Sequence, residues 1–339
     1  MRPVARIARV AGIALAVGLA GCDSGKTLVL GTAWPIAYRF GVPEMVAELA
    51  SDSSTDNPTL TGDLLEIYFT SDRGGNADVW FATRASRNDP FGTPAPVTAV
   101  NGDSFETSSA ISADGLTLWF GSDRGGGAGG IDVWVSERPS RTAGWSTPFN
   151  VVALNSAAAD IPRPVGYHGL VMPMASTKMN ASNPSTGNYQ TYLASRSSLG
   201  APFGVPVAIP ELASPDSSTV DGFLTDDGLT LFFSSAPLPA QTDGGAGGGA
   251  GADGGAGKDA GRSGDAAADG GATVPKSDLY VAWRLSTTEP FGMKQPLTDL
   301  NTPADERDPW LSPDGTTLYF TSDRSGVLNI YSVQVKKRY

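Results

Sequence analysis

One sequence pattern occurs in five copies along the chain, and this repetition constrains the fold more than any other feature. The clearest copies, residues 111–120 and 311–320, carry an Asp-Gly turn before an apolar run, and Ser-Asp-Arg follows each. Similar copies span 60–69 and 224–233, and a degenerate copy spans 165–174. The equivalent positions at the ends of the apolar runs are Phe69, Phe120, Met174, Phe233 and Phe320. A period of about 50 residues is typical of repeat architectures.

A second set of positions keeps step with the first. An aromatic residue shortly before a proline recurs at spacings that match to within one residue, namely at Phe40, Phe91, Trp145, Phe203 and Phe291. The last interval is longer because residues 243–272 form a tract of Gly, Ala and Asp with no aromatic or β-branched residue. Such a tract cannot bury enough apolar surface to become ordered. We therefore expect a disordered insertion within the fourth blade.

Each copy contains about four short β-forming segments separated by turn residues. Four-stranded units repeated at this spacing form the blades of a β-propeller. The sequence thus predicts an all-β, five-bladed propeller over residues 40–339. The last copy lacks a fourth segment, whereas residues 43–49 precede the first copy. We expect this N-terminal strand to complete the C-terminal blade and close the ring.

The repeat, S-P-D-G-x-x-L-Y-F-x-S-D-R followed by D/N-I-Y, resembles that of the TolB-like (WD40-like, PD40) periplasmic β-propellers. The resemblance covers residues 40–339. It departs from the pattern at Ser235-Ala236-Pro237 in the fourth copy and at Met172-Pro173-Met174 in the third. The TolB family has a separate N-terminal α/β domain, but only about 17 residues precede the first repeat here after Cys22. The resemblance therefore implies the propeller and not the TolB role.

The N-terminus has the features of an export signal. Arg2, Arg6 and Arg9 precede or enter an apolar run that ends in Leu19-Ala20-Gly21-Cys22. The run is too short to span a bilayer, and its basic start and small-residue end are typical of a signal peptide. The last four residues resemble a bacterial lipobox, and Cys22 is the single cysteine. We expect a signal peptide over 1–21, lipidation (palmitate) at Cys22 and a tether over 22–39.

These features indicate a lipoprotein of the bacterial cell envelope. It would be anchored to the inner or outer membrane, with its propeller in the periplasm or at the surface. The net charge of −11 disfavours nucleic acid, whose phosphates require Lys and Arg. The sequence calls for no cofactor and no metal. An envelope protein or a small ligand is the expected partner.

The polar residues that recur in every well-formed copy are expected to be structural. One aspartate per copy stands where it can bond its own turn, at Asp63, Asp114, Asp227 and Asp314. The Asp-Arg pairs that follow are expected to bond carboxylates or loop carbonyls within a blade, at Asp72, Arg73, Asp123, Arg124, Asp323 and Arg324. His168, the single histidine, aligns with the turn aspartates.

One further acid per copy precedes the turn motif at a similar distance, namely Asp56, Glu106, Asp160, Asp221 and Glu306. Equivalent positions of a propeller form a ring, so these residues are candidates to bind a cation or a partner at the channel mouth. A solvated acidic face is the simpler interpretation.

The even spread of carboxylates and the lack of any catalytic triad predict a non-catalytic propeller that binds a partner or ligand. The alternative is a carbohydrate-active propeller, either sialidase-like or glycosidase-like, which would need two carboxylates in one cleft. Acidic residues that break the repeat and converge at the channel mouth would distinguish the two hypotheses.

Overall fold

The computed structural model describes residues 37–178, 188–238 and 275–338. The predicted signal peptide, Cys22 and the insertion at 243–272 lie outside these ranges. The described chain belongs to one compact unit that starts at Ile36. It consists almost entirely of strands, with a single short 3-10 helix, η1 (Val152–Leu154), in the described part.

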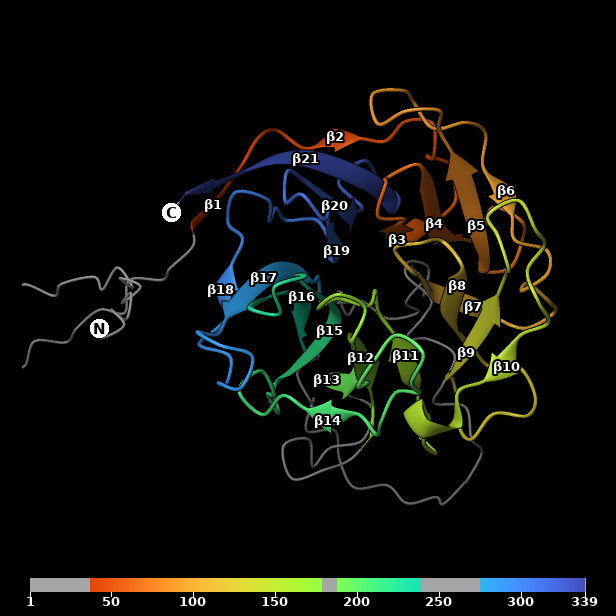
Figure 1. Ribbon diagram of the computed structural model, residues 1–339. Helices are drawn as coiled ribbons and strands as arrows, with labels where there is room; N and C mark the ends of the chain where they lie inside the picture. The colour runs from red at the N-terminus through yellow and green to blue at the C-terminus, as the bar shows by residue number, and fades with distance from the viewer. Residues whose placement is uncertain (1–36, 179–187, 239–274, 339) are drawn as a thin grey trace, which may run out of the picture. The chain divides into compact units, whose positions relative to one another are not determined.

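The strands form five antiparallel sheets arranged around a central axis (Figure 1). Blade 1 holds β3 (Thr55–Leu60), β4 (Glu66–Ser71), β5 (Asp78–Thr83) and β6 (Ala95–Pro96). Blade 2 holds β7 (Glu106–Ile111), β8 (Thr117–Ser122), β9 (Asp132–Glu137) and β10 (Phe149–Asn150). Blade 3 holds β11 (Asp160–Pro162), β12 (Val171–Ser176), β13 (Gln190–Ser195) and β14 (Val207–Ala208).

Blade 4 holds β15 (Ser217–Leu224), β16 (Thr230–Pro237), β17 (Asp278–Trp283) and β18 (Gln295–Pro296). Blade 5 holds β19 (Glu306–Leu311), β20 (Thr317–Ser322) and β21 (Asn329–Arg338), to which β1 (Ala37–Phe40) and β2 (Glu44–Met45) are added. The innermost strands are β3, β7, β11, β15 and β19 (Figure 1). The predicted all-β propeller of five blades is confirmed.

The N-terminal segment closes the ring as predicted, because β2 pairs with β21 through Glu44 opposite Ser332 and Met45 opposite Tyr331. The Val46 amide adds a bond of 2.9 Å to the Ile330 carbonyl. The pairing therefore uses the first half of residues 43–49. The structure also adds β1, which pairs with the end of β21 and lies partly within the predicted tether. Together β1 and β2 cover the outer edge of β21, which would otherwise be unpaired.

The hydrophobic core lies in layers between neighbouring blades. Successive side chains of a strand point to opposite faces, so the paired aromatic residues of the second strand in blades 1, 2, 4 and 5 serve two layers. Trp119 packs in the layer between blades 2 and 3, whereas Phe120 packs in the layer between blades 1 and 2. Both are at most 5% exposed. The aromatic pair in the repeat is thus explained by packing.

An arginine follows the third strand in four blades and explains the second aromatic ladder. Each guanidinium lies 4.4–4.7 Å from the ring centre of the ladder aromatic. Each Nε also donates a hydrogen bond to a carbonyl in or next to the turn that joins the first two strands. Cation–π contacts of this kind stabilise the fold where the cation is partly desolvated. The four residues are Arg84, Arg138, Arg196 and Arg284.

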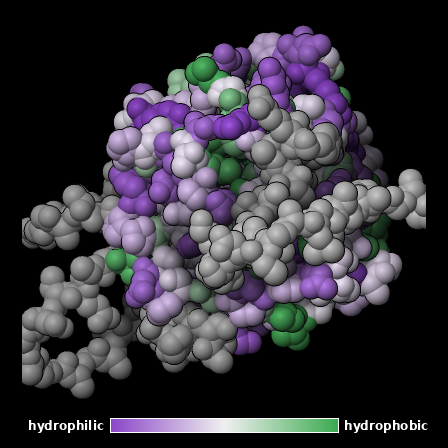
Figure 2. Space-filling view, turned by 90° about the vertical axis from the view of Figure 1, so that its left-hand side faces the viewer, coloured by the Kyte–Doolittle hydropathy of each residue, from purple (hydrophilic) through white to green (hydrophobic). Residues whose placement is uncertain are grey.

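The outer surface has only scattered apolar residues, and the side shown in Figure 2 is mainly hydrophilic with isolated hydrophobic positions. Exposed examples such as Val42, Val152 and Leu285 come from different blades. Within the described ranges, no helix is long and apolar enough to cross a membrane. The structural features that could recognise a ligand lie in the central channel.

One buried ion pair between blades provides a test of the packing. Arg138 of blade 2 contacts Glu66 of blade 1 at 2.5 Å, and both side chains are at most 11% exposed. Replacing Arg138 by Met should lower the free energy of unfolding by up to about 3 kcal/mol, because Glu66 loses its nearest counter-charge and keeps only the 3.6 Å contact with Arg141. Urea unfolding measures the loss. The double variant Arg138→Met/Glu66→Gln should lose less than the two single variants combined, and strict additivity would contradict the pairing.

Candidate functional site in the central channel

Four of the five innermost strands have the same irregularity. The register against the second strand shifts after Asp56, Thr107, Val220 and Arg307. The next residue in each case has a positive φ between 52° and 61°, namely Asn57, Ser108, Asp221 and Asp308. This conformation is unusual for residues other than glycine. A β-bulge of this kind redirects a side chain.

The third blade has no such shift, and it supplies Arg163 immediately after β11. The guanidinium of Arg163 reaches the redirected side chains of all four other blades. Nη2 pairs with Asp221 and lies 2.7 Å from Oδ1 of Asp308. Nη1 donates to Oδ1 of Asn57 and, at 3.2 Å, to Oγ of Ser108. Arg163 therefore joins the five blades at the channel axis.

The charges at this point largely compensate one another. Burial lowers the pKa of Arg163, and the carboxylate of Asp308 opposes that effect. Burial also acts to lower the pKa of the neighbouring Arg307, but Asp305, Asp308 and Asp56 outweigh it, so its pKa is raised. Both guanidinium groups thus stay cationic within the cluster of carboxylates.

A cavity of about 280 Å³ lies on one side of Arg163, where the innermost strands begin. We call it the acidic chamber. Its lining includes six polar residues of the inner strands of four blades, namely Asp56, Asn57, Ser108, Asp221, Arg307 and Asp308. The Asp56 carboxylate accepts a 2.8 Å bond from the Asn57 amide, and Asp221 accepts from the Ser234 hydroxyl. Three carboxylates and a cation therefore meet in one hollow.

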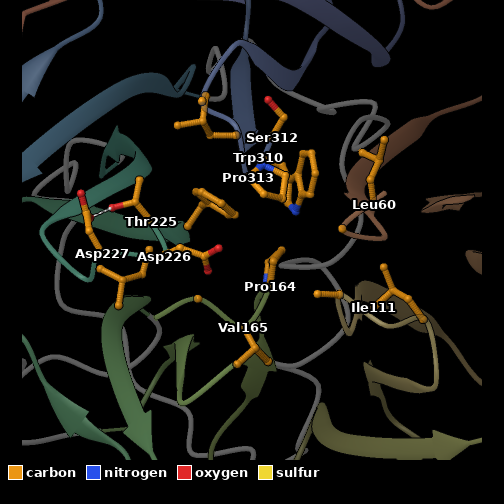
Figure 3. A pocket seen from close by; sticks show the side chains of 17 residues that line it. Leu60, Ile111, Pro164, Val165, Thr225, Asp226, Asp227, Trp310, Ser312 and Pro313 are labelled. Carbon is orange, nitrogen blue, oxygen red and sulfur yellow. Dashed lines mark hydrogen bonds between the residues drawn. The ribbon is translucent and has the colours of Figure 1, made fainter. Parts of the chain in front are cut away.

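A second cavity of about 240 Å³ lies on the other side, among the turns that follow the innermost strands. We call it the tryptophan pocket. Its lining is mostly apolar, with Leu60, Ile111, Val165 and Trp310 among the residues labelled in Figure 3. The view shows the side chains of Trp310 and Asp226 directed toward the open space between the strands (Figure 3). Between the two cavities lie Arg163 and three prolines, Pro58, Pro164 and Pro309.

The five acids predicted as a ring do not occupy one equivalent position. Glu106, Asp160 and Glu306 each stand opposite the serine at the end of the second strand. They are buried within their blades, and Glu106 and Glu306 pair with Arg124 and Arg324. Burial raises the pKa of Glu106 despite the nearby arginine.

Asp56 and Asp221 lie one and two residues further along their strands, and these two reach the acidic chamber. The geometry therefore brings two of the five acids into the chamber. A shift of one residue sends the Asp56 side chain to the opposite face, and the β-bulge with its positive φ redirects Asp221. Partner or cation binding by the five acids remains a prediction.

The recurring polar residues have local partners. Each turn aspartate accepts the backbone N–H two residues further on, as Asp114 does from Leu116 at 3.0 Å, and Asp63, Asp227 and Asp314 do the same. Arg73, Arg124 and Arg324 donate to a serine and to a loop carbonyl. Asp123 and Asp323 accept backbone N–H groups, and the Asp72 carbonyl accepts from Gly75.

His168 lies in the turn before β12 with a φ of 55°, and its backbone N–H donates to Asp226. Among residues 37–178, 188–238 and 275–338, no group of three or more His, Cys, Asp or Glu could hold a metal ion.

Sequence reasoning missed the residues at the centre of the channel. Arg163, Asn57, Ser108 and Asp308 differ in type from blade to blade, so a search for recurring residues passes over them. One signal was available: a proline follows Asn57, Arg163 and Asp308 directly. The proline therefore identifies the same position in three blades, although the residue before it differs in each.

No family model matches the chain, and no curated protein matches it. Solved structures do match. The endo-arabinase from Bacteroides thetaiotaomicron shares 13% identity and a TM-score of 0.50, over 87% of this chain and 97% of that one. The TolB from Acinetobacter baumannii shares 13% identity at a TM-score of 0.47, over 85% of this chain, which spans only 55% of that protein. The GH62 alpha-L-arabinofuranosidase catalytic domain from Coprinopsis cinerea shares 9% identity at a TM-score of 0.46, over 84% and 91%.

These findings correct the prediction of a non-catalytic binding protein. That prediction rested on a regular repeat, yet propellers of the same fold include an endo-arabinase that this chain matches over nearly the whole of both lengths. The channel also contains what the alternative required, because Asp56 and Asp221 stand out of step with the repeat and line one chamber. The other acids are spread evenly because they form hydrogen bonds and ion pairs within their blades. Their even distribution is therefore no argument against a catalytic site in the channel.

The role of Arg163 can be tested through a double-mutant cycle of stability. Arg163→Met removes the charge that pairs with Asp221 and Asp308, so the free energy of unfolding at pH 7 should fall by about 3–5 kcal/mol. In the double variant Arg163→Met/Asp308→Asn one of the two carboxylates is also neutral, so its loss should be smaller than the losses of the two single variants combined. Urea titrations measure the three losses, and a double variant whose loss equals the sum of the two would contradict the assignment.

Proposed function

We propose that the chain is a carbohydrate-active propeller enzyme that hydrolyses a glycosidic bond in the acidic chamber. The observation that carries this proposal is the convergence of Asp56, Asp221 and Asp308, from three blades, on one cavity in the channel. Glycoside hydrolysis generally uses a pair of carboxyl groups on either side of the scissile bond. The chamber offers such groups and a volume suited to part of a glycan.

The surroundings of the three acids suggest different roles. Asp308 is bonded on both oxygens, by Arg163 and by the Asn57 backbone N–H at 3.2 Å, and its side chain is 4% exposed. It is suited to holding Arg163 in place. Asp221 also contacts Arg163 but is more accessible, with 11% of its side chain exposed. We assign to Asp221 the role of the ionised base or nucleophile.

Asp56 is the candidate general acid. Its carboxyl group lines the chamber and accepts the Asn57 side-chain amide at 2.8 Å, and the other two acids of the chamber have the roles given above. In the proposed reaction, Asp56 gives its proton to the glycosidic oxygen as the bond to the anomeric carbon breaks. Asp221 either attacks that carbon or takes a proton from the attacking water. Arg163 holds the Asp221 carboxylate in place through their ion pair.

The structural likeness supports this choice of substrate class. The endo-arabinase matched at a TM-score of 0.50 shows that the same propeller accommodates an enzyme that acts on arabinan. Arabinose-containing glycans are therefore the first substrates to test.

Hydrolysis should be measured with linear arabinan and a panel of aryl glycosides. Asp56→Asn and Asp221→Asn should each lower kcat/KM by about two or more orders of magnitude, since each removes a proton-transfer or nucleophilic group. Asp226→Asn, an acid in the tryptophan pocket, is the matched control and should retain activity. The proposal is wrong if the wild-type protein hydrolyses none of these substrates, or if both chamber variants match the control.

We further propose that the protein is an envelope lipoprotein held by acyl chains on Cys22. The support comes from the basic start, the short apolar run and the sequence Leu19-Ala20-Gly21-Cys22. More than one acyl chain would make the attachment stable. An enzyme placed there could meet glycans outside the cytoplasm. Binding of an envelope protein partner stays a prediction.

Lipidation can be tested with a palmitate analogue in a bacterial host. The wild-type protein should be labelled and sediment with membranes, whereas Cys22→Ala should be unlabelled and shift to the soluble fraction. Cys22→Ser, which keeps the size of the side chain, should behave like the alanine variant. Labelling of either variant would refute the anchor.

A further inference from the structure

The tryptophan pocket plays no part in the proposed hydrolysis. It lies on the other side of the layer formed by Arg163 and its neighbouring prolines, so a ligand in the acidic chamber cannot reach it directly. Its residues belong to the ends of the innermost strands and to the turns after them, and none of the residues that line it carries a positive charge. The pocket therefore needs its own explanation.

The indole of Trp310 supplies a hydrogen-bond donor. Its side chain is held between Tyr319 and Phe223, whose ring centres lie 6.0 and 5.9 Å away. Trp310 is 5% exposed as a residue, but its Nε1 is not among the fully buried nitrogen atoms of the described chain that lack a partner, unlike Nε1 of Trp80 and Trp134. Figure 3 shows this nitrogen facing the open space of the pocket. An indole N–H that faces a pocket can donate to a ligand atom with a lone pair in place of water.

Asp226 supplies a fixed negative charge at the same pocket. One of its oxygens accepts the His168 backbone N–H at 3.3 Å, which orients the carboxylate without neutralising it. The neighbouring Asp227 is engaged in its own turn through Thr225 and Leu229. Asp226 points into the open space (Figure 3). A carboxylate beside an apolar wall favours a cationic group over a neutral one.

We propose that this pocket binds an apolar group that carries both an ammonium and a nearby carbonyl, as an N-terminal apolar residue of a peptide or an amino-acid amide does. The ammonium would pair with Asp226, the carbonyl would accept from Nε1 of Trp310, and the apolar side chain would lie against Leu60, Ile111 and Val165. Charge complementarity selects this class. A sugar is a poorer match because Trp310 presents its N–H edge here, whereas sugars stack on ring faces.

The probe is L-leucinamide, and its binding is measured by calorimetry together with saturation-transfer NMR. N-acetyl-L-leucinamide keeps the side chain and a carbonyl but lacks the charge, so it should bind at least about tenfold more weakly. Asp226→Asn should cause a similar loss for L-leucinamide and none for the acetylated compound. Trp310→Phe should also weaken binding. Asp221→Asn, in the acidic chamber, should leave it unchanged.

Several results would overturn the proposal. These are no measurable binding of L-leucinamide at millimolar concentration, equal binding of the two amides, or full binding by Asp226→Asn. Competition by a methyl glycoside that depends on Trp310 would show a sugar site in its place. Because Asp226 and Trp310 lie outside the acidic chamber, each of these outcomes is independent of whether the protein hydrolyses glycans.

Discussion

A buried guanidinium group at the channel axis holds the five blades in one arrangement. Neighbouring blades of a propeller contact each other mainly through apolar side chains. Such contacts have no directional bonds, so they do not by themselves fix the position of one blade against the next. Arg163 differs because it touches polar side chains from all four other blades at once. The charge is costly to bury, and only the simultaneous presence of Asp221 and Asp308 offsets that cost. The geometry of the channel therefore depends on all five blades being in register.

The same constraint explains the irregular inner strands. Asn57, Ser108, Asp221 and Asp308 adopt a positive φ that costs energy in an ordinary strand. Their bulges redirect side chains that would otherwise lie between blades, so that they converge on the guanidinium. Strained backbone and a cluster of charged side chains occur together in the acidic chamber. This combination is typical of functional sites. This arrangement favours a reactive chamber over a simple structural plug.

The fold could be read from the sequence because its signals recur. The aromatic pairs, the turn aspartates and the spacing of the second ladder each report a position in the blade, and together they gave the number of blades and the closing strand. The channel could not be read in the same way. Its residues change from blade to blade, and the acids that seemed equivalent by spacing differ by one or two positions in the strand. That difference decides whether a side chain enters a blade, as Glu106 does, or the chamber, as Asp56 does.

The role of the ladder aromatics needed the structure for another reason. Phe91 and its counterparts are contacted by arginines that follow the third strand, and these arginines bond the turn of the same blade. The contact brings together the turn after the first strand, the arginine after the third strand and the aromatic residue that follows it. No local pattern shows it, although Arg84, Arg138, Arg196 and Arg284 recur at one position.

Hydrogen–deuterium exchange of Arg163→Met, compared with the wild type and with Arg196→Met, tests the central claim most directly. If Arg163 ties the blades together, its loss should raise exchange in the inner strands β3, β7, β15 and β19 at once, although they belong to four other blades. Arg196→Met removes an arginine of the same blade that stacks on Trp119 and Phe203 away from the axis, and its effect should stay within blades 2 and 3. Increased exchange confined to blade 3 in the Arg163 variant would contradict the account.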